Sequence, residues 1–352
     1  MIDFDSYTQD AVDLLKRLIT IPSVSRNEGE CAKVMVETLE GYGLHPQTSG
    51  CNTFVVSEPF DPSRETILLN AHIDTVKPVA SWQRDPFSPT MEDDRLYGLG
   101  SNDCGGGLVS LLQVFRIMTA DMSKAKYNFV YLASCEEEVS GAGGISQVLP
   151  MLPHIDVAIV GEPTGMQPAI AEKGLMVLDI TSRGKSGHAA RSEGVNAIYG
   201  ILDDLEWIRN YKFDKVSPLL GPVLMQVTQV NAGTQHNVVP DICTAVVDVR
   251  TNEYYTNEEV YDIVANHCHS EVKARSYRLR SSSINPNHLL IDKCRAMGME
   301  PFGSPTLSDQ ALMRFPSFKL GPGQSSRSHS ADEYICISEI ADAIRKCVSL
   351  LS

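Results

Sequence analysis

Apolar residues in the first 170 positions alternate between two spacings, which predict helices and strands in turn. Apolar positions at helical spacing predict helices over 10–20, 30–39, 108–118 and 143–149. Continuous apolar runs, the pattern of strands buried on both faces, predict strands over 53–56, 66–70, 129–134 and 157–160. This alternation predicts an α/β sheet covered by helices on both faces.

The pattern changes beyond about residue 174. Strands are expected over 175–181, 223–230, 243–249 and 271–279, and helices over 196–209 and 257–268. The order β-α-β-β-α-β is that of a small ferredoxin-like layer. After Asn285-Pro286 another helix begins, and a final helix is expected over 337–351. We therefore expect a discontinuous main domain, 1–173 and 287–352, with a lid domain, 174–286, inserted into it.

Charge and composition exclude several classes of protein. The chain has 44 acidic and 30 basic residues, a net charge of −14, which argues against binding to nucleic acid or anionic membranes. The acidic start MIDFD has no apolar core of a signal peptide, and no apolar run reaches the roughly 18 residues of a membrane span. Nine cysteines without CxxC spacing suit reduced thiols. We expect a soluble, cytoplasmic protein.

The first candidate for chemistry lies at the end of the strand over 66–70. His72 and Asp74 are two residues apart, so they share one side of an extended chain. A carboxylate in that position can orient an imidazole that binds a metal. A core histidine beside a turn aspartate fits the same segment.

The glycine-rich segment 97–107 contains the second candidate. GLGSND lacks the third glycine of a dinucleotide fingerprint, and no P-loop lysine follows it, so a nucleotide site is disfavoured. The segment leaves Asp103 as a lone carboxylate at the entry to a helix. Its simpler interpretation is an N-cap residue.

Three consecutive acidic residues follow the strand over 129–134. Their mutual repulsion is tolerated in solvent or beside a cation, and both interpretations stay open. On an extended segment adjacent side chains point to opposite sides, so Glu136 and Glu137 would have different tasks, one facing substrate and one facing metal.

Two more candidates complete the set. Glu162 follows the strand over 157–160, and His329 lies in the loop before the last helix. Active sites of α/β sheets lie beyond the carboxyl ends of the strands, so all these residues are expected at one edge. Together they offer the nitrogen and oxygen donors expected for zinc, and no cysteine cluster indicates a structural site.

Five motifs, HIDTV, GSNDCGGG, SCEEE, GEPT and SHSADE, occur here in the order found in one known family. The chain resembles the dinuclear zinc amidohydrolases and exopeptidases, which include acetylornithine deacetylase, succinyl-diaminopimelate desuccinylase and glutamate carboxypeptidase. The resemblance spans nearly the whole chain and implies a zinc-exopeptidase-like sheet with an inserted lid. It also implies two divalent ions, zinc or cobalt, with the ligands His72, Asp103, Glu137, Glu162 and His329.

The same resemblance implies other roles in the main domain. Asp103 would bridge both ions and be followed by a cis peptide. Asp74 would orient His72, and Glu136 would be the general base that takes a proton from water and passes it to the leaving amine.

The lid has motifs of its own. GKSGHAA resembles the segment whose histidine, here His188, helps to stabilise the oxyanion, often from the partner subunit of a homodimer formed through the lid. GTQHNVVP and DVR resemble a substrate-facing loop, with Asn237, and an arginine, Arg250, that offers a planar fork to a carboxylate. Each of the three has a simpler interpretation: His188 as a turn residue, Asn237 as a turn former before Pro240, and Arg250 as a surface charge at a strand end.

These features predict hydrolysis of an N-acyl L-amino acid, foremost an N2-acyl-L-ornithine, in arginine biosynthesis. The acyl group is acetyl or succinyl. Arg327, and Arg191 after the lid histidine, favour succinyl if they bind its distal carboxylate, because a buried carboxylate needs a cation. The alternative is that both arginines pair with surface acids or bind the α-carboxylate of the amino acid. Succinyl-diaminopimelate, N-acetyl-lysine and dipeptides share the same metal chemistry. Two other classes are a dehydrogenase, disfavoured by the incomplete glycine fingerprint, and a noncatalytic binding protein on the same fold.

Overall fold

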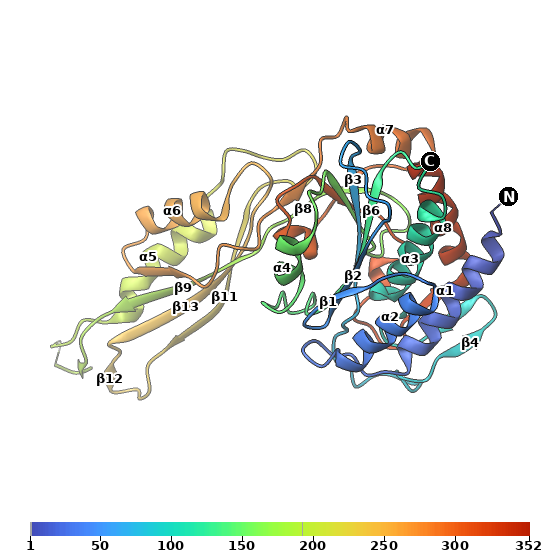
Figure 1. The fold of residues 1–352 in the computed structure, drawn as a ribbon. Helices are drawn as coiled ribbons and strands as arrows, with labels where there is room; N and C mark the ends of the chain where they lie inside the picture. The colour runs from blue at the N-terminus through green and yellow to red at the C-terminus, as the bar shows by residue number, and fades with distance from the viewer. Residues whose placement is uncertain (1, 192) are drawn as a thin grey trace. The chain divides into compact units, whose positions relative to one another are not determined.

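A computed structural model describes residues 2–191 and 193–352, and the chain forms two compact units (Figure 1). The first unit comprises residues 1–170, 284–302 and 308–352, and the second comprises 171–283 and 303–307. The chain therefore leaves the first unit after residue 170 and returns to it at residue 284. A further excursion of five residues, 303–307, belongs to the second unit.

The first unit is built on a mixed sheet with the strand order β1-β2-β6-β3-β7-β17-β8. The four central strands β6, β3, β7 and β17 pair in parallel, whereas β1, β2 and β8 pair antiparallel. Every residue of β3 and β6 is buried, as expected for strands covered on both faces. The strands are β1 (Gln47–Ser49), β2 (Asn52–Val56), β3 (Thr66–His72), β6 (Asn128–Ser134), β7 (Val157–Val160), β8 (Ala169–Glu172) and β17 (Ser317–Lys319).

Helices cover both faces of this sheet. Figure 1 shows α1, α3 and α8 grouped on one face, where they pack on one another, and α4 on the other face. On the α4 side, Phe54, Leu68 and Ile145 belong to one buried apolar cluster. The α/β architecture expected from the apolar runs is confirmed. The helices are α1 (Phe4–Ile19), α2 (Gly29–Gly41), α3 (Gly106–Thr119), α4 (Ile145–Val148), α7 (Leu289–Ala296) and α8 (Ile337–Leu351), with short turns η1 (Ser101–Gly105), η2 (Leu149–Met151), η3 (Asp309–Leu312) and η4 (Ser325–Arg327).

A small antiparallel sheet that the apolar pattern did not predict joins two distant parts of the first unit. Its order is β18-β5-β4. Tyr334 of β18 pairs with Tyr97 of β5, so the segment that follows His329 lies beside the segment that precedes Asp103. The strands are β4 (Thr90–Glu92), β5 (Arg95–Tyr97) and β18 (Tyr334–Cys336).

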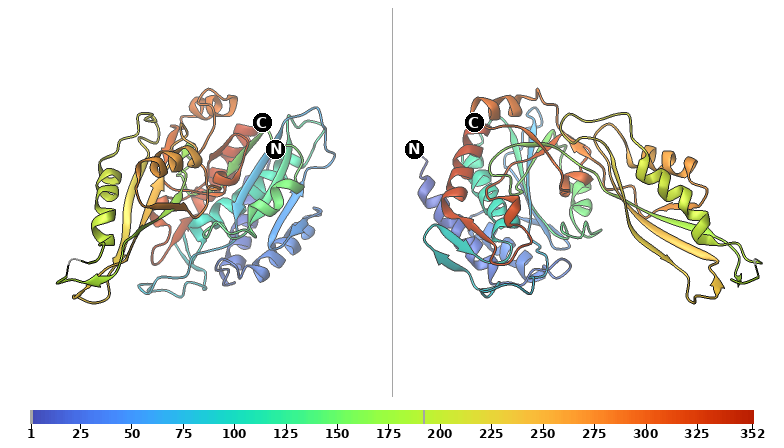
Figure 2. Two further views of the ribbon diagram at one scale, coloured as in Figure 1. Left: turned by 90° about the vertical axis from the view of Figure 1, so that its left-hand side faces the viewer. Right: turned by 180° about the vertical axis from the view of Figure 1, so that it is seen from behind.

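The second unit has the expected order β-α-β-β-α-β. Its four-stranded antiparallel sheet has the order β11-β13-β9-β14, a ferredoxin-like arrangement. Burial alternates along β9 and β13, because one face packs on α5 and α6, which lie on the same side of the sheet (Figures 1 and 2). The elements are β9 (Met176–Arg183), α5 (Ala197–Asn210), β11 (Leu224–Ala232), β13 (Ile242–Arg250), α6 (Asn257–His267) and β14 (Glu271–Ala274).

Four short strands complete the secondary structure of the described residues. β10 (Gly187–His188) and β12 (Val238–Val239) form a two-stranded ribbon within the second unit. β15 (Ser282–Ser283) pairs with β8, and β16 (Phe302–Ser304) also joins that strand. In the part of the chain that the structure describes, no helix combines the length and the apolarity needed to span a membrane.

Candidate metal centre

Two histidines face the two oxygens of one carboxylate at the carboxyl edge of the main sheet. His72 ends β3, Asp103 lies in η1, and His329 lies in the loop before β18. The distance from His72 Nε2 to Asp103 Oδ1 is 3.4 Å, and that from His329 Nε2 to Asp103 Oδ2 is 3.6 Å. The peptide between Asp103 and Cys104 is cis, as expected. This geometry suits a carboxylate shared by two cations.

Hydrogen bonding fixes the tautomer of His72. Its Nδ1 lies 2.8 Å from the backbone carbonyl oxygen of Asp74, which can only accept, so Nδ1 carries the proton. The Asp74 carboxylate is farther from Nδ1, at 3.5 Å. Both the carbonyl and the carboxylate of Asp74 thus lie beside Nδ1, the carbonyl closer, and Nε2 is left as an acceptor.

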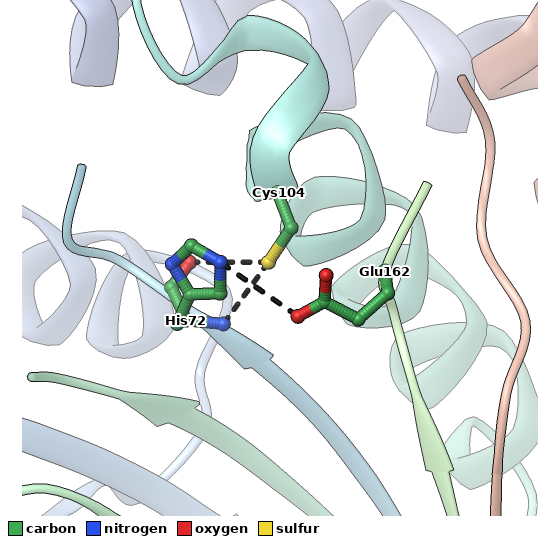
Figure 3. A group of neighbouring side chains, drawn as sticks. All are labelled: His72, Cys104 and Glu162. Atoms are coloured by element: carbon green, nitrogen blue, oxygen red, sulfur yellow. Dashed lines mark hydrogen bonds and ion pairs between the residues drawn. The ribbon is translucent and has the colours of Figure 1, made fainter. Parts of the chain in front are cut away.

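Two buried polar atoms aim at the same point without a hydrogen-bond partner. They are His72 Nε2 and Glu162 Oε1, which are 3.7 Å apart (Figure 3). The His72 side chain is only 1% exposed. Since buried polar groups are normally satisfied, such a pair fits a metal ion as the shared partner of both atoms. A nitrogen and carboxylate oxygens are donors that zinc accepts.

Figure 3 also places the Cys104 thiol beside these atoms. Its Sγ accepts a hydrogen bond from the His72 backbone N–H at 3.2 Å and lies 3.6 Å from the His72 carbonyl oxygen. Burial raises the pKa of this thiol. It therefore packs against the β3 backbone in its protonated form.

The acidic run is held by Asp74. The Asp74 carboxylate accepts hydrogen bonds from the backbone N–H groups of Glu137, at 3.0 Å, and Glu138, at 3.2 Å, and from the Ser25 hydroxyl at 2.7 Å. Glu138 then reaches His329, whose Nε2 lies 3.0 Å from Glu138 Oε2. The Asp74 side chain thus holds the acidic run and also lies beside the His72 ring.

The structure shifts the expected roles in this run by one residue. Glu136 has φ = +55°, and its Oε2 accepts a hydrogen bond from the Gly143 N–H at 3.1 Å. Its carboxylate fills the space beside Gly141 and Gly143, where an added Cβ would clash with it. The carboxylates that lie beside the two histidines are those of Glu137, 4.0 Å from His72 Nε2, and Glu138.

Because Glu136 is left-handed and residues 137–140 form a turn, the assumption of an extended segment fails here. Glu138 is the ligand candidate that the sequence argument missed. The signal that could have found it is the presence of a third acid in the run.

The electrostatics of the cluster favour bound cations. Burial and the nearby Asp103 carboxylate raise the pKa of Glu162 to about 8, and burial with the charge of Glu162 raises that of Glu137 well above its usual range. The hydrogen bond that the His329 ring donates to the Glu138 carboxylate raises the pKa of His329 to about 9. Carboxylates that lie close together with little solvent repel one another. Divalent cations between them would neutralise this repulsion.

Two of the expected lid residues lie together in the second unit. His188, in β10, pairs with Val238 of β12, and the Ala189 N–H donates to the Asn237 carbonyl oxygen at 3.0 Å. Both His188 and Asn237 are exposed. The ribbon β10–β12 therefore presents them from one small structure.

The arginines expected to bind substrate form ion pairs within the chain. Arg250 holds Asp248 through Nε, at 2.7 Å, and Nη2, at 3.1 Å. Arg327 holds both oxygens of Glu339, at 2.7 and 3.1 Å, and stacks over the Tyr334 ring. The fork that Arg327 was expected to offer to a succinyl group is thus used by Glu339, and the structure does not support that role.

Comparisons with known proteins agree with this centre. The family model for peptidase family M20/M25/M40 matches residues 68–352. An acetylornithine deacetylase of Pectobacterium carotovorum subsp. carotovorum (strain PC1) is 28% identical over 357 residues, covering 92% of each chain. Among solved structures, aminopeptidase PepT from Bacillus cereus ATCC 10987 has a TM-score of 0.76 at 16% identity, over 98% of each chain. The YXEP protein of Bacillus subtilis, described as a dinuclear metal-binding peptidase, has a TM-score of 0.75 at 16% identity, over 99% of this chain and 98% of its own.

Proposed function

Since the chain belongs to peptidase family M20/M25/M40 and is a metallohydrolase of that family, we propose that it hydrolyses the amide bond of an N-acyl L-amino acid, foremost an N2-acyl-L-ornithine. The substrate is proposed from the acetylornithine deacetylases, which are 27–28% identical to this chain over 92% of their length. The products are L-ornithine and a carboxylic acid.

One observation supports the hydrolytic centre above all others. Asp103 presents one oxygen to each of two histidines, and an unpartnered nitrogen and an unpartnered oxygen face each other beside it. A carboxylate placed between two ligand sets is the arrangement that two-ion hydrolysis requires.

The residues divide into two ligand sets around Asp103. We propose His72 and Glu162 for the first ion and Glu138 and His329 for the second, with zinc as the ion and cobalt as a substitute. Bound there, the two ions would supply a Lewis acid for the scissile carbonyl and lower the pKa of a water.

Glu137 is the carboxylate left over, and we propose it as the proton carrier in place of Glu136. It lies at the cluster, 4.0 Å from His72 Nε2, and its backbone is fixed by Asp74. Glu137 would take the proton of the attacking water and return it to the leaving amine. Its buried position and raised pKa suit a group that must hold a proton between these two steps.

The lid residues are proposed to bind the substrate. His188 would donate to the oxyanion and Asn237 would contact the amide, because the ribbon β10–β12 presents both. Arg250 would bind the α-carboxylate through Nη1, since its pair with Asp248 uses Nε and Nη2.

An amine-release screen tests the proposal. Purified enzyme, stripped by chelation and reloaded with zinc or cobalt, is offered N2-acetyl-L-ornithine, N2-succinyl-L-ornithine, N-succinyl-diaminopimelate, N-acetyl-lysine and a dipeptide. We expect ornithine release from an N2-acyl-ornithine, with the highest kcat/KM of the panel, only after metal is restored. Cleavage of the dipeptide alone would overturn the substrate, and no amide cleavage by metal-loaded enzyme would overturn the function.

We also propose that the second unit forms a homodimer interface. β11 is an edge strand whose side chains are largely exposed, and α5 beside it exposes Tyr199 and Leu202. A groove of about 610 Å³ between them is lined by Leu202, Leu205 and Met225, among others. An exposed apolar groove beside an edge strand suits a two-fold contact.

Light scattering after size exclusion tests this interface. Wild type is expected at the mass of two chains, and Leu202→Glu at the mass of one. Met151→Glu, a matched change at an exposed apolar residue of the first unit, is expected to remain a dimer. A monomeric wild type, or a dimeric Leu202→Glu, would contradict the proposal.

A further inference from the structure

A buried carboxylate outside both ligand sets holds the Asp103 segment. Glu333 lies four residues after His329, immediately before β18, and is only 2% exposed. Its Oε1 accepts hydrogen bonds from the backbone N–H groups of Asn102, at 2.8 Å, and Asp103, at 2.9 Å. Its Oε2 accepts a third from the Gly100 N–H at 3.2 Å. One side chain therefore satisfies three donors of one short loop.

The loop needs this partner because its backbone is irregular. Gly100 has φ = +74°, and Asp103 has φ = −116° and ψ = 99°, outside the helical region. The N–H groups at these positions are not part of a regular ladder, and a buried N–H without an acceptor is costly. Glu333 supplies the acceptors that a helix or strand would otherwise provide.

A second contact ties the same two segments together. The Asn102 side chain accepts a hydrogen bond from the Gln324 N–H at 3.0 Å and donates to the Gln324 carbonyl oxygen at 3.1 Å. The segment that provides His329 is thus joined to the segment that provides Asp103 on both sides of that histidine. Between these two connections, His329 Nε2 lies 3.6 Å from Asp103 Oδ2.

We propose that Glu333 is a positioning residue that keeps Asp103 between the two metal sites. It touches neither the proposed ions nor the substrate. By fixing the Asp103 N–H, it sets the orientation in which one carboxylate oxygen faces His72 and the other faces His329. Without it the loop would relax, and the second ion, whose other ligands are Glu138 and His329, would bind more weakly. This inference rests on the proposed two-ion function.

Metal binding measured directly tests the inference. Glu333→Ala and Glu333→Gln are titrated with cobalt, with visible absorption, EPR and metal analysis of the folded protein as readouts. We expect Glu333→Ala to lose about 10–100-fold in affinity for the second ion, the usual effect of removing an outer-sphere partner, and to lose spin coupling between the ions. Glu333→Gln keeps one acceptor oxygen for Asn102 and Asp103, so it is expected to recover most of the affinity and the coupling.

Asp332→Asn is the matched control. The Asp332 carboxylate also accepts two backbone N–H groups, at 3.1 Å from Gln83 and 3.0 Å from Arg84, but in a different loop. It is expected to bind two coupled ions like wild type. Circular dichroism shows whether each variant is folded. If Glu333→Ala is not folded, Glu333→Asp takes its place, because its carboxylate is one methylene too short to reach all three N–H groups. Weaker binding of the second ion by folded Glu333→Asp supports the role, and wild-type binding overturns it.

The outcomes separate this inference from the proposed function. If wild type binds two coupled ions and folded Glu333→Ala binds them with the same affinity and coupling, Glu333 has only a structural role and the inference is wrong. If wild type itself binds no pair of ions, the proposed function fails first.

Discussion

Replacing Glu137 by glutamine tests which residue of the acidic run carries the proton. The amide has nearly the same shape as the carboxylate, so the ligands around it should stay in place, but it cannot take a proton from water. Glu137 lies 4.0 Å from His72 Nε2 at the cluster, whereas Glu136 is bound to Gly143 in its own loop. The matched variant is therefore Glu136→Gln.

The expected losses of kcat in Glu137→Gln and Glu136→Gln differ by orders of magnitude. Loss of a general base costs about 10²–10⁴-fold in rate, or about 3–5 kcal/mol of transition-state stabilisation. In Glu136→Gln the amide oxygen still accepts the Gly143 N–H, and only the extra strength of a charged acceptor, about 1 kcal/mol, is lost from folding stability. We expect its kcat to stay within about threefold of wild type.

The assay combines kcat from amine release with the metal content of the same preparations. We expect Glu137→Gln to keep both ions and lose nearly all turnover, and Glu136→Gln to keep both ions and turnover. A large loss of kcat in Glu136→Gln, together with a near-normal kcat in Glu137→Gln, would refute the reasoning. Loss of an ion from Glu137→Gln would make that residue a ligand instead.

Two further predictions concern the support of the acidic run. Asp74→Asn should lower the free energy of unfolding by about 1–3 kcal/mol and reduce bound metal below two ions per chain, because the Glu137 and Glu138 N–H groups bind different Asp74 oxygens and one of these becomes an NH2 group. Urea unfolding and metal analysis measure this, and a stable variant with two ions would contradict it. Gly141→Ala should lower the free energy of unfolding by about 1–3 kcal/mol, because its Cβ would lie 1.7 Å from Glu136 Oε2. In the control Gly29→Ala the added Cβ meets no atom within 4 Å, so the same urea titration should show no change in stability.

Those parts of the fold that bury apolar residues on a regular spacing could be predicted from the sequence. The strands β3 and β6 are buried along their whole length, and the apolar runs place them within two residues of their observed ends. The order of elements in the second unit follows from its alternating strands in the same way. The sheet β18-β5-β4 has three-residue strands that are too short for a pattern, so only the structure reveals it.

The details of the site depend on backbone geometry and on distant partners. His72 and Glu162 could be identified because they lie at the carboxyl ends of buried strands, His72 as the last residue of β3 and Glu162 two residues after β7. Which carboxylates of the acidic run face the histidines could not be predicted. This depends on a left-handed backbone at Glu136 and on hydrogen bonds to Asp74, which is far away in sequence. The partner of Arg327 is Glu339, on the next helix, and no local pattern indicates that pair.

The central claim is that Asp103 bridges two ions, and the most direct measurement of it is EPR spectroscopy during cobalt titration of the stripped protein. We predict two cobalt ions per chain, with spin coupling that appears as the second ion binds and is lost in Asp103→Ala. A folded wild-type protein that saturates with one ion, or binds two ions without coupling, would contradict the account.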